Sequence, residues 1–254
     1  MENFDMYISS DGYFVVEEFD IKYLIDFSES NIPSMPEVTE TSARIAGRDG
    51  DIVLASTYEP ISFEIVCYTE DNLTSVEKVE EESKINSLLE SIKNKTKTLA
   101  MQKYSKFYNV KYSAALTTVN YPKHLKFSIP LKSSNPYAMN LTKSEESGNA
   151  QFHSNTIKEV GAIFTIEGPA TLPHISLNDF QMEYDNSLIE GTKLVIDTKN
   201  STATFVDTNN SKTNAMRYYN HQFPKIQPGD NELEILSGIE NEEQVKVEWY
   251  DLKL

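Results

Sequence analysis

The feature of this sequence that most constrains its fold is an alternation of apolar and polar side chains in short segments. Between Ile61 and Cys67 every second side chain is apolar, while Ser62, Glu64 and Val66 occupy the opposite face of an extended strand. Six further segments are short, rich in β-branched and aromatic residues, and bounded by Asn, Asp, Gly or Pro. They are Phe127–Leu131, Gly161–Glu167, Lys193–Asp197, Thr202–Asp207, Glu232–Leu236 and Val245–Tyr250. The pattern predicts a mostly β protein.

One segment, from Asn72 to Lys95, has helical periodicity instead. Thr74 and Glu77 have the spacing of a capping box, in which each side chain satisfies a backbone amide of the other. Acidic residues lie at the start of the segment and lysines at its end, as the helix dipole favours. We therefore predict a helix over about 73–94, with an apolar face formed by Leu73, Val76, Val79, Ile85, Leu88, Leu89 and Ile92.

A domain boundary is expected between Asn135 and Asn149. The segment Ser133–Tyr137 contains Asn-Pro and is typical of a turn, and Lys143–Asn149 is polar and small, as linkers are. Strands and the helix precede this region, and only strands follow it. The prediction is an α+β amino-terminal domain over residues 1–138 and an all-β carboxy-terminal domain over residues 139–254.

Charge and cysteine content exclude several classes of protein. With 39 acidic and 23 basic side chains, the chain carries a net charge of −16. This charge opposes sequence-specific binding of nucleic acid and adsorption to anionic membranes. The single cysteine, Cys67, can form neither an intrachain disulfide nor a thiolate metal site. No secretory signal or membrane-spanning run is recognisable, so we expect synthesis in a reducing cytoplasm.

Catalytic and metal-binding motifs are not found. The sequence contains no nucleophile elbow, P-loop, dinucleotide fingerprint or HExxH motif. Asp207–Asn214 has oxygen-bearing side chains, but Lys212 and Tyr218 stand where a calcium loop needs Gly and Glu, so a polar hairpin loop is favoured. We predict no enzyme activity, no cofactor and no metal. The four histidines are widely separated: His124, His153, His174 and His221.

Two turns carry more information. The first, Arg44–Gly50, contains two glycines and leads toward the apolar residues Ile52–Leu54. The second, Phe223–Asn231, contains a Pro-Gly turn before the strand at Glu232–Leu236. In the same half of the chain, Gly191–Thr198 ends in Ile-Asp-Thr and is followed by a return strand at Thr202–Asp207.

In this order, the segments resemble the siphophage-type distal tail proteins, a phage tail component family that also occurs in prophages and tail-like bacteriocins. Arg44–Gly50 with the strand Ile61–Tyr68 is similar to the amino-terminal domain of that family, and the later segments are similar to its second domain. The resemblance extends over nearly the whole chain. The residues that carry the family pattern are Gly47, Arg48, Gly50, Asp197, Phe223, Pro224, Pro228, Gly229 and Asn231.

The resemblance implies a structural protein without catalytic residues. Its expected fold is a ring-forming, β-sandwich-like amino-terminal domain with one helix, joined to a galectin-like or carbohydrate-module-like β-sandwich. Six copies would form a hub at the tail tip or baseplate of the virion, through which DNA could pass. The implied partners are further copies of the chain, the tail tube protein, the tail-tip or tail-associated lysin protein and, as an open possibility, a receptor-binding protein on the outer domain.

Two alternatives stay open at this point. A carbohydrate-binding β-sandwich that recognises host glycans would need an exposed aromatic platform, for which Trp249, Tyr218 and Tyr219 are the candidates. Trp249 alternates with two valines and is expected in the core, and Tyr218 and Tyr219 point in opposite directions if the chain is extended there. A glycoside hydrolase would need a pair of carboxylates at a defined separation, which the sequence does not specify.

Overall fold

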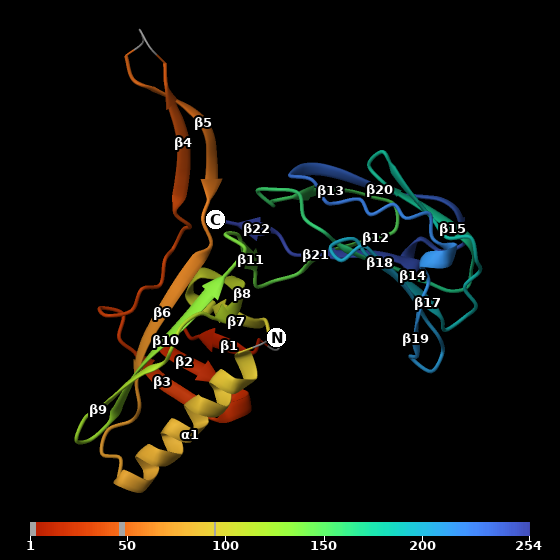
Figure 1. Cartoon of the computed structure of the whole chain (residues 1–254). Coiled ribbons are helices and arrows are strands. Elements are labelled where there is room, and N and C mark those ends of the chain that lie inside the picture. Colours follow the sequence, from red (N-terminus) through yellow and green to blue (C-terminus); the bar gives the residue numbers. More distant parts are fainter. Residues whose placement is uncertain (1–3, 46–48, 94) are drawn as a thin grey trace. The chain divides into compact units, whose positions relative to one another are not determined.

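The protein is described by a computed structural model that covers residues 4–45, 49–93 and 95–254 (Figure 1). Strands dominate the chain, which confirms the predicted mostly β class. The chain folds into two compact units, residues 1–141 together with Leu254, and Thr142–Lys253. The domain boundary predicted after residue 138 stays a prediction. No helix in the described part of the chain is long and apolar enough to cross a lipid bilayer.

The amino-terminal unit contains one long helix, α1 (Ser75–Ile92), and two short 3-10 helices, η1 (Glu17–Phe19) and η2 (Gln102–Tyr104), within the residues described. Its strands are β1 (Met6–Ile8), β2 (Tyr13–Val16), β3 (Ile21–Ile25), β4 (Val38–Arg44), β5 (Asp51–Tyr58), β6 (Ile61–Tyr68), β7 (Lys97–Met101), β8 (Lys106–Tyr112), β9 (Thr117–Asn120), β10 (Leu125–Ser133) and β11 (Ala138–Asn140).

Most of these strands form one sheet that closes on itself. The order is β11-β8-β7-β1-β2-β3-β6-β10-β9, and an additional pairing of β8 with β10 closes the sheet into a barrel. Neighbouring strands are antiparallel except β1 and β7, which are parallel. We expected a sandwich-like amino-terminal domain, and the structure shows that its main sheet is closed into a barrel. Closure removes the open edges that a flat sheet would leave.

The alternation read from the sequence fills this barrel. In β6, Ile61, Phe63, Ile65 and Cys67 are buried while Ser62 and Glu64 are exposed. Val66, expected on the polar face, is also buried, at 4% exposure. Its amide donates a hydrogen bond to the hydroxyl of Ser30 at 2.9 Å, so the segment before β4 runs along the edge of β6 here.

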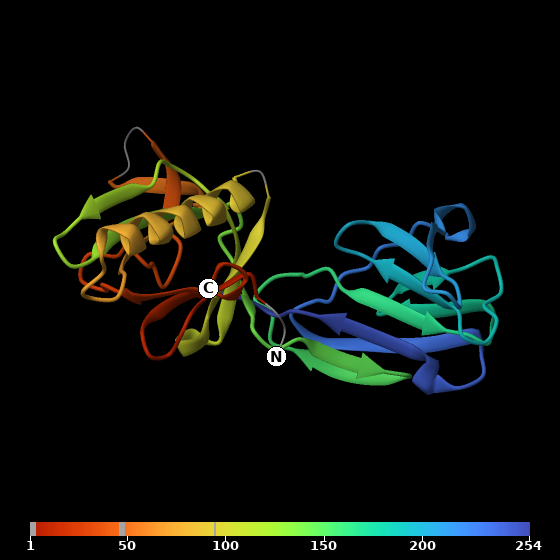
Figure 2. The same cartoon turned by 90° about the horizontal axis from the view of Figure 1, so that it is seen from below.

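The helix begins as predicted and then departs from its predicted face. Thr74 caps α1, and the capping box with Glu77 is present in both directions. Ile85, Leu88, Leu89 and Ile92 pack into the barrel core, and α1 lies alongside the sheet in Figure 2. The prediction that Val76 and Val79 belong to the apolar face is wrong: they are 69% and 65% exposed, and Lys78 is buried in their place.

The carboxy-terminal unit is a sandwich of two antiparallel sheets, with two short 3-10 helices, η3 (Met216–Tyr218) and η4 (Glu242–Gln244). One sheet has the order β12-β21-β14-β17-β18-β19 and the other β13-β20-β15-β16. The strands are β12 (Ser144–Ser147), β13 (Ala150–Ser154), β14 (Ile163–Glu167), β15 (Ala170–Leu177), β16 (Phe180–Glu183), β17 (Lys193–Asp197), β18 (Thr202–Val206), β19 (Lys212–Asn214), β20 (Gly229–Ile239), β21 (Val245–Trp249) and β22 (Leu252–Lys253).

Side chains from both sheets meet in a single core, as in aligned sandwiches. Phe164 and Val247 come from the first sheet, and Ile175 and Leu233 from the second. Trp249 is 4% exposed, packs against Phe152 with ring centroids 4.9 Å apart and ring planes tilted by 34°, and donates a hydrogen bond of 2.9 Å to Asp251. Its predicted place in the core is confirmed.

The polar segment predicted as a linker is instead a strand. β12 pairs with β21 in antiparallel register, with Ser144 opposite Trp249. The side chains that give the segment its linker-like composition form ion pairs across the sheet, Glu145 with Lys246 at 2.7 Å and Lys143 with Glu248 at 3.5 Å. An edge strand can be polar on both faces because main-chain pairing holds it.

Candidate functional site

In the described part of the chain, no group of three His, Cys, Asp or Glu side chains is placed so that it could hold a metal ion. Three histidines each lie beside one carboxylate: His124 beside Asp71, His153 beside Asp230, and His174 beside Glu183. Burial raises the pKa of the Cys67 thiol well above its ordinary value, so the side chain stays protonated and unreactive.

The most unusual surface of the amino-terminal unit is a hairpin formed by β4 and β5, here called the arm (residues Val38–Arg44 and Asp51–Tyr58). The two strands pair with each other in a sheet of their own and extend beyond the barrel, away from α1 (Figure 1). Nearly every side chain of the arm is exposed on both faces. The large apolar ones are Val38, Val53, Leu54 and Tyr58, at 52%, 51%, 65% and 38% exposure.

This exposure conflicts with the composition of β5. Ile52–Ala55 is a continuous apolar run, which is typical of a strand covered on both faces. A two-stranded hairpin is at best marginally stable in water, because it buries little apolar surface of its own. The arm therefore has the composition of an element that is completed by contact with another surface.

The loop of the arm contains the first family motif. Gly50 has a φ of +82°, a conformation that favours glycine, and a Cβ there would meet no atom within 4 Å. Gly47 and Arg48 lie outside the described residues. Residues of high β propensity lie on both sides of the glycine turn, but they do not alternate with polar ones, so the turn is the one sequence signal of the arm.

The second family motif builds the turn before β20. Asn231 is 3% exposed, and both polar atoms of its side-chain amide form hydrogen bonds. Its Nδ2 donates to the carbonyls of Gln227 and Gly229 at 2.9 and 3.0 Å, and its Oδ1 accepts from the amide of Gln227 at 2.9 Å and from Asn178 at 3.2 Å. Gly229 takes a φ of +86°, as the turn requires.

The other motif residues also have local structural roles. Pro224 is buried and Pro228 is exposed, and Phe223 packs against Tyr219 with ring centroids 5.3 Å apart. Asp197 accepts hydrogen bonds from the amides of Lys199 and Asn200, both at 3.0 Å, and so shapes the turn between β17 and β18. Gly50 belongs to the amino-terminal unit and these residues to the carboxy-terminal unit.

The predicted polar loop at Asp207–Asn214 is part of a hairpin, as favoured. Asp207 accepts hydrogen bonds from the amides of Asn209 and Ser211, both at 2.8 Å, between β18 and β19. Its carboxylate thus stabilises the turn by accepting hydrogen bonds from the main chain.

The aromatic platform of the carbohydrate hypothesis is incomplete. Tyr218 is 41% exposed, but Tyr219 is 3% exposed and donates its hydroxyl to the carbonyl of Gln222. The two rings therefore do not present one surface to a sugar.

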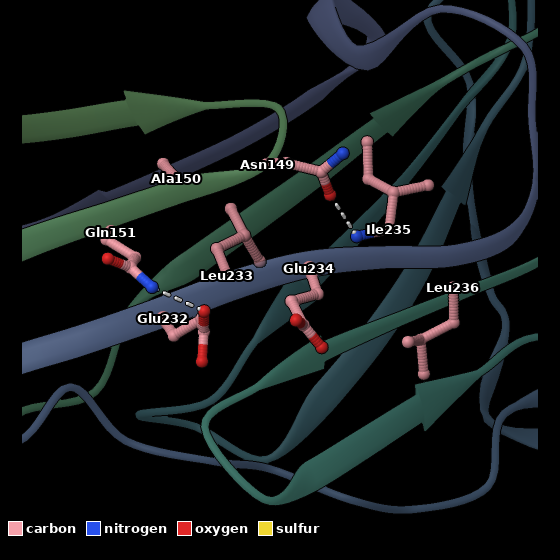
Figure 3. A pocket seen from close by; sticks show the side chains of 8 residues that line it. All are labelled: Asn149, Ala150, Gln151, Glu232, Leu233, Glu234, Ile235 and Leu236. Carbon is pink, nitrogen blue, oxygen red and sulfur yellow. Dashed lines mark hydrogen bonds between the residues drawn. The ribbon is translucent and has the colours of Figure 1, made fainter.

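A shallow pocket of about 430 Å³ lies on the β13–β20 side of the sandwich (Figure 3). Its polar groups bond to one another. Asn149 Oδ1 accepts from the amide of Ile235 at 2.6 Å, and Gln151 donates to Glu232 at 2.8 Å. These bonds align the two strands. The lining consists of Asn149, Ala150, Gln151, Glu232, Leu233, Glu234, Ile235 and Leu236.

Comparison with known proteins shows that this chain is similar to components of phage tails. Residues 157–251 match the family described as siphovirus-type tail component, C-terminal domain. No curated protein sequence matches the chain. Among solved structures, the SPP1 Dit protein, described as a paradigm of the hub adsorption apparatus of phages that infect Gram-positive bacteria, is similar over 100% of both chains, with a TM-score of 0.67 and 11% identity.

Chains of the phage P2 baseplate in its activated conformation are also similar. The form with Ca gives a TM-score of 0.58 at 8% identity, and the form with Sr gives 0.60 at 9%, each over 97% of this chain and 95% of the other. Identities this low show the fold alone. Together with the matched family domain, they confirm the resemblance to distal tail proteins.

Proposed function

We propose that this chain is a structural distal tail protein that assembles, through its amino-terminal unit, into a hexameric hub at the tail tip. In this proposal the ring connects the tail tube protein to the tail-tip protein or baseplate, and DNA passes through its centre. The galectin-like carboxy-terminal domain (residues 139–254) carries the outer contacts, including any receptor-binding protein. The chain is made in the bacterial host cytoplasm and acts in the virion tail without catalysis.

The observation that carries this proposal is the arm. Its β4–β5 sheet has two strands in the part of the chain described, so each strand has one edge that can accept another strand. Val53 and Leu54 are consecutive and exposed, and Leu54 is the extra residue of a β-bulge opposite Thr41 and Ser42, so the arm carries apolar surface that is open to solvent. A closed ring of more than two copies needs two different contact surfaces on each copy, and an arm that reaches beyond its own barrel can supply one of them.

The mass of the purified protein in solution tests the proposal. Light scattering across a concentration series should give six times the 28.9 kDa of one chain. Replacing Val53 and Leu54 together by Asp would place two charges on the exposed apolar surface of the arm, and this variant should have the mass of a single chain. The matched control is Ile189→Asp, since Ile189 is 67% exposed in the other unit.

A hexamer that survives the double substitution would show that the arm does not join the copies. A single-chain mass for the unaltered protein at every concentration, without a change when the tail tube protein is added, would contradict the ring itself.

A further inference from the structure

A row of apolar and aromatic side chains crosses the outer face of the amino-terminal barrel. Leu24 of β3 lies directly opposite Tyr13 of β2 and directly opposite Tyr68 of β6, so the three side chains stand next to one another on the same face. Leu24 is 51% exposed. A leucine between two tyrosines on the solvent side of a sheet provides apolar surface that the core of the barrel does not use.

These side chains line a hollow of about 600 Å³. Tyr121, from the turn between β9 and β10, also lines it and is 39% exposed. Sites that hold a small molecule have volumes of about 300–1,000 Å³ and combine apolar or aromatic side chains with a few polar groups. We call the space lined by Tyr13, Leu24, Tyr68 and Tyr121 the tyrosine hollow.

Two of the tyrosine rings are held in place by other side chains of the barrel. Tyr121 stacks on His124, with ring centroids 4.9 Å apart and 29° between the ring planes. His124 also meets Tyr68 edge to face, with centroids 5.3 Å apart, and the hydroxyl of Tyr68 donates a hydrogen bond of 3.2 Å to Asp26. Because these rings are already fixed, a ligand would bind without the entropy cost of ordering them.

The tyrosine hollow also presents polar groups that have no hydrogen-bond partner among the described residues. These groups are the hydroxyls of Tyr13 and Tyr121, the ammonium group of Lys22 and the carboxylate of Glu70, all on residues that line the hollow. The ammonium group only donates, the carboxylate only accepts, and the hydroxyls do both. A ligand that carries several hydroxyl groups can bond to all of them, since each of its hydroxyls is a donor and an acceptor.

The charges at the hollow favour a neutral ligand. The ammonium group of Lys22 lies 4.8 Å from the ring centroid of Tyr13, and that of Lys126 lies 5.6 Å from the ring centroid of Tyr68. The chain's own cations therefore already lie over two rings that a cationic ligand would need. An anionic ligand would meet the carboxylate of Glu70.

We propose that the tyrosine hollow binds a neutral saccharide. The C–H groups on one face of a sugar ring would contact Leu24 and the tyrosine rings, and its hydroxyls would bond to Lys22 and Glu70. The site belongs to the amino-terminal unit and differs from the platform at Tyr218 and Tyr219, which is incomplete. It would add a binding activity to the proposed hub and does not depend on the ring, because saccharide binding can be measured whatever the oligomeric mass.

An array of neutral mono- and oligosaccharides, probed with the purified full-length protein, tests the proposal. Calorimetry then gives the affinity for the saccharide that binds best. Tyr121→Ala removes one ring and Glu70→Gln removes one charge at constant shape, and each should weaken binding about tenfold or more. Tyr104→Ala is the matched control, since Tyr104 is 53% exposed elsewhere in the same unit. The amino sugar and the uronate with the same ring should bind more weakly than the neutral sugar.

Four results would overturn the inference. The first is an array on which no neutral saccharide binds. The second is equal affinity of Tyr121→Ala and Tyr104→Ala, which would place the site elsewhere. The third is tighter binding of a charged analogue than of the neutral sugar. The fourth is loss of binding to the tail tube or tail-tip protein in both hollow variants while no saccharide binds, which would make the hollow a protein contact. The mass measurement decides separately whether the ring proposal fails.

Discussion

The ammonium nitrogen of Lys78 lies 2.9 Å from the side-chain oxygen of Asn120, and it is enclosed by the carbonyl groups of the turn that follows β9. All of these partners are uncharged oxygens. A lysine in the core-facing row of a helix is costly unless its hydrogen bonds are satisfied, and here the turn satisfies them. The first turn of α1 is thus attached to the barrel by a polar contact.

Replacing Lys78 by Met should therefore destabilise the amino-terminal unit. The apolar part of the side chain is kept, but the turn loses a charged donor, and hydrogen bonds to charged groups contribute about 1.5–3 kcal/mol each. We expect the free energy of unfolding in urea to fall by about 2 kcal/mol. Lys93→Met at the exposed end of α1 is the control, and equal stability of the two variants would contradict the anchoring role.

The contact between Asp5 and Thr98 predicts a dependence of stability on pH. The Asp5 carboxylate accepts hydrogen bonds from the amide of Thr98 at 2.8 Å, from its hydroxyl at 2.9 Å, and from Lys97 at 2.9 Å. Burial, the largest single influence, raises the pKa of Asp5, but these bonds together outweigh it and hold the pKa below its ordinary 3.8. The stabilisation is therefore present above pH 3.8 and is lost as the pH falls through the lower pKa of the folded state.

Asp5→Asn should be less stable than the unaltered protein at pH 7 and should lose less stability on acidification. The measurement is the urea midpoint between pH 7 and pH 2, with Asp11→Asn as an exposed control. Parallel curves for the unaltered protein and Asp5→Asn would show that this carboxylate does not contribute to the acid sensitivity.

Several strands can be predicted because they have one buried and one solvated face. The predicted segment Lys193–Asp197 has the bounds of β17, and Phe127–Leu131 lies inside β10. In such strands the alternation of apolar and polar residues shows directly which face is buried. It fails at Val66, which is buried although it lies on the face expected to be polar.

The parts that could not be predicted are those whose surroundings lie outside the local pattern. Val76 and Val79 fit the helical period, but the pattern contains no information on which side of the first turn a polar acceptor will be found. Ser144–Ser147 is polar because it is an edge strand, and its pairing with β21 is non-local. The arm has no core, so its strands lack a buried face that would set a period.

Replacing Asn231 by Ala should lower the free energy of unfolding strongly, although the substitution is small. Its buried amide makes four hydrogen bonds that fix the turn into β20, so Asn231→Ala would leave the main-chain groups of Gln227 and Gly229 without partners. We expect a loss of about 2–3 kcal/mol in the free energy of unfolding of the carboxy-terminal unit. Asn209→Ala in the exposed β18–β19 turn is the control. A loss below about 0.5 kcal/mol for Asn231→Ala, within the range of ordinary surface substitutions, would contradict the role.

The contribution of β12 to the carboxy-terminal unit, which begins at Thr142, can be tested with two shortened chains. A chain over residues 142–254 retains β12 and should unfold cooperatively in urea. A chain over residues 150–254 lacks β12, so it loses the main-chain pairing with β21 and leaves that strand at an open edge. We expect the shorter chain to have a lower urea midpoint and a greater tendency to aggregate. Equal midpoints would mean that Lys143–Asn149 contributes as little as a linker would.

The arm predicts a change in amide exchange on assembly. In a single chain, the β4–β5 hydrogen bonds have no buried side chains over them, so opening should be frequent and exchange fast. In the assembled ring, contact with another copy should cover Val53 and Leu54 and slow the exchange of the neighbouring amides at least tenfold. Hydrogen exchange read by mass spectrometry can compare the assembled protein with the single-chain form of the double Asp variant, using β6 as an internal reference. Fast exchange of the arm in both forms would place it outside the contact between copies.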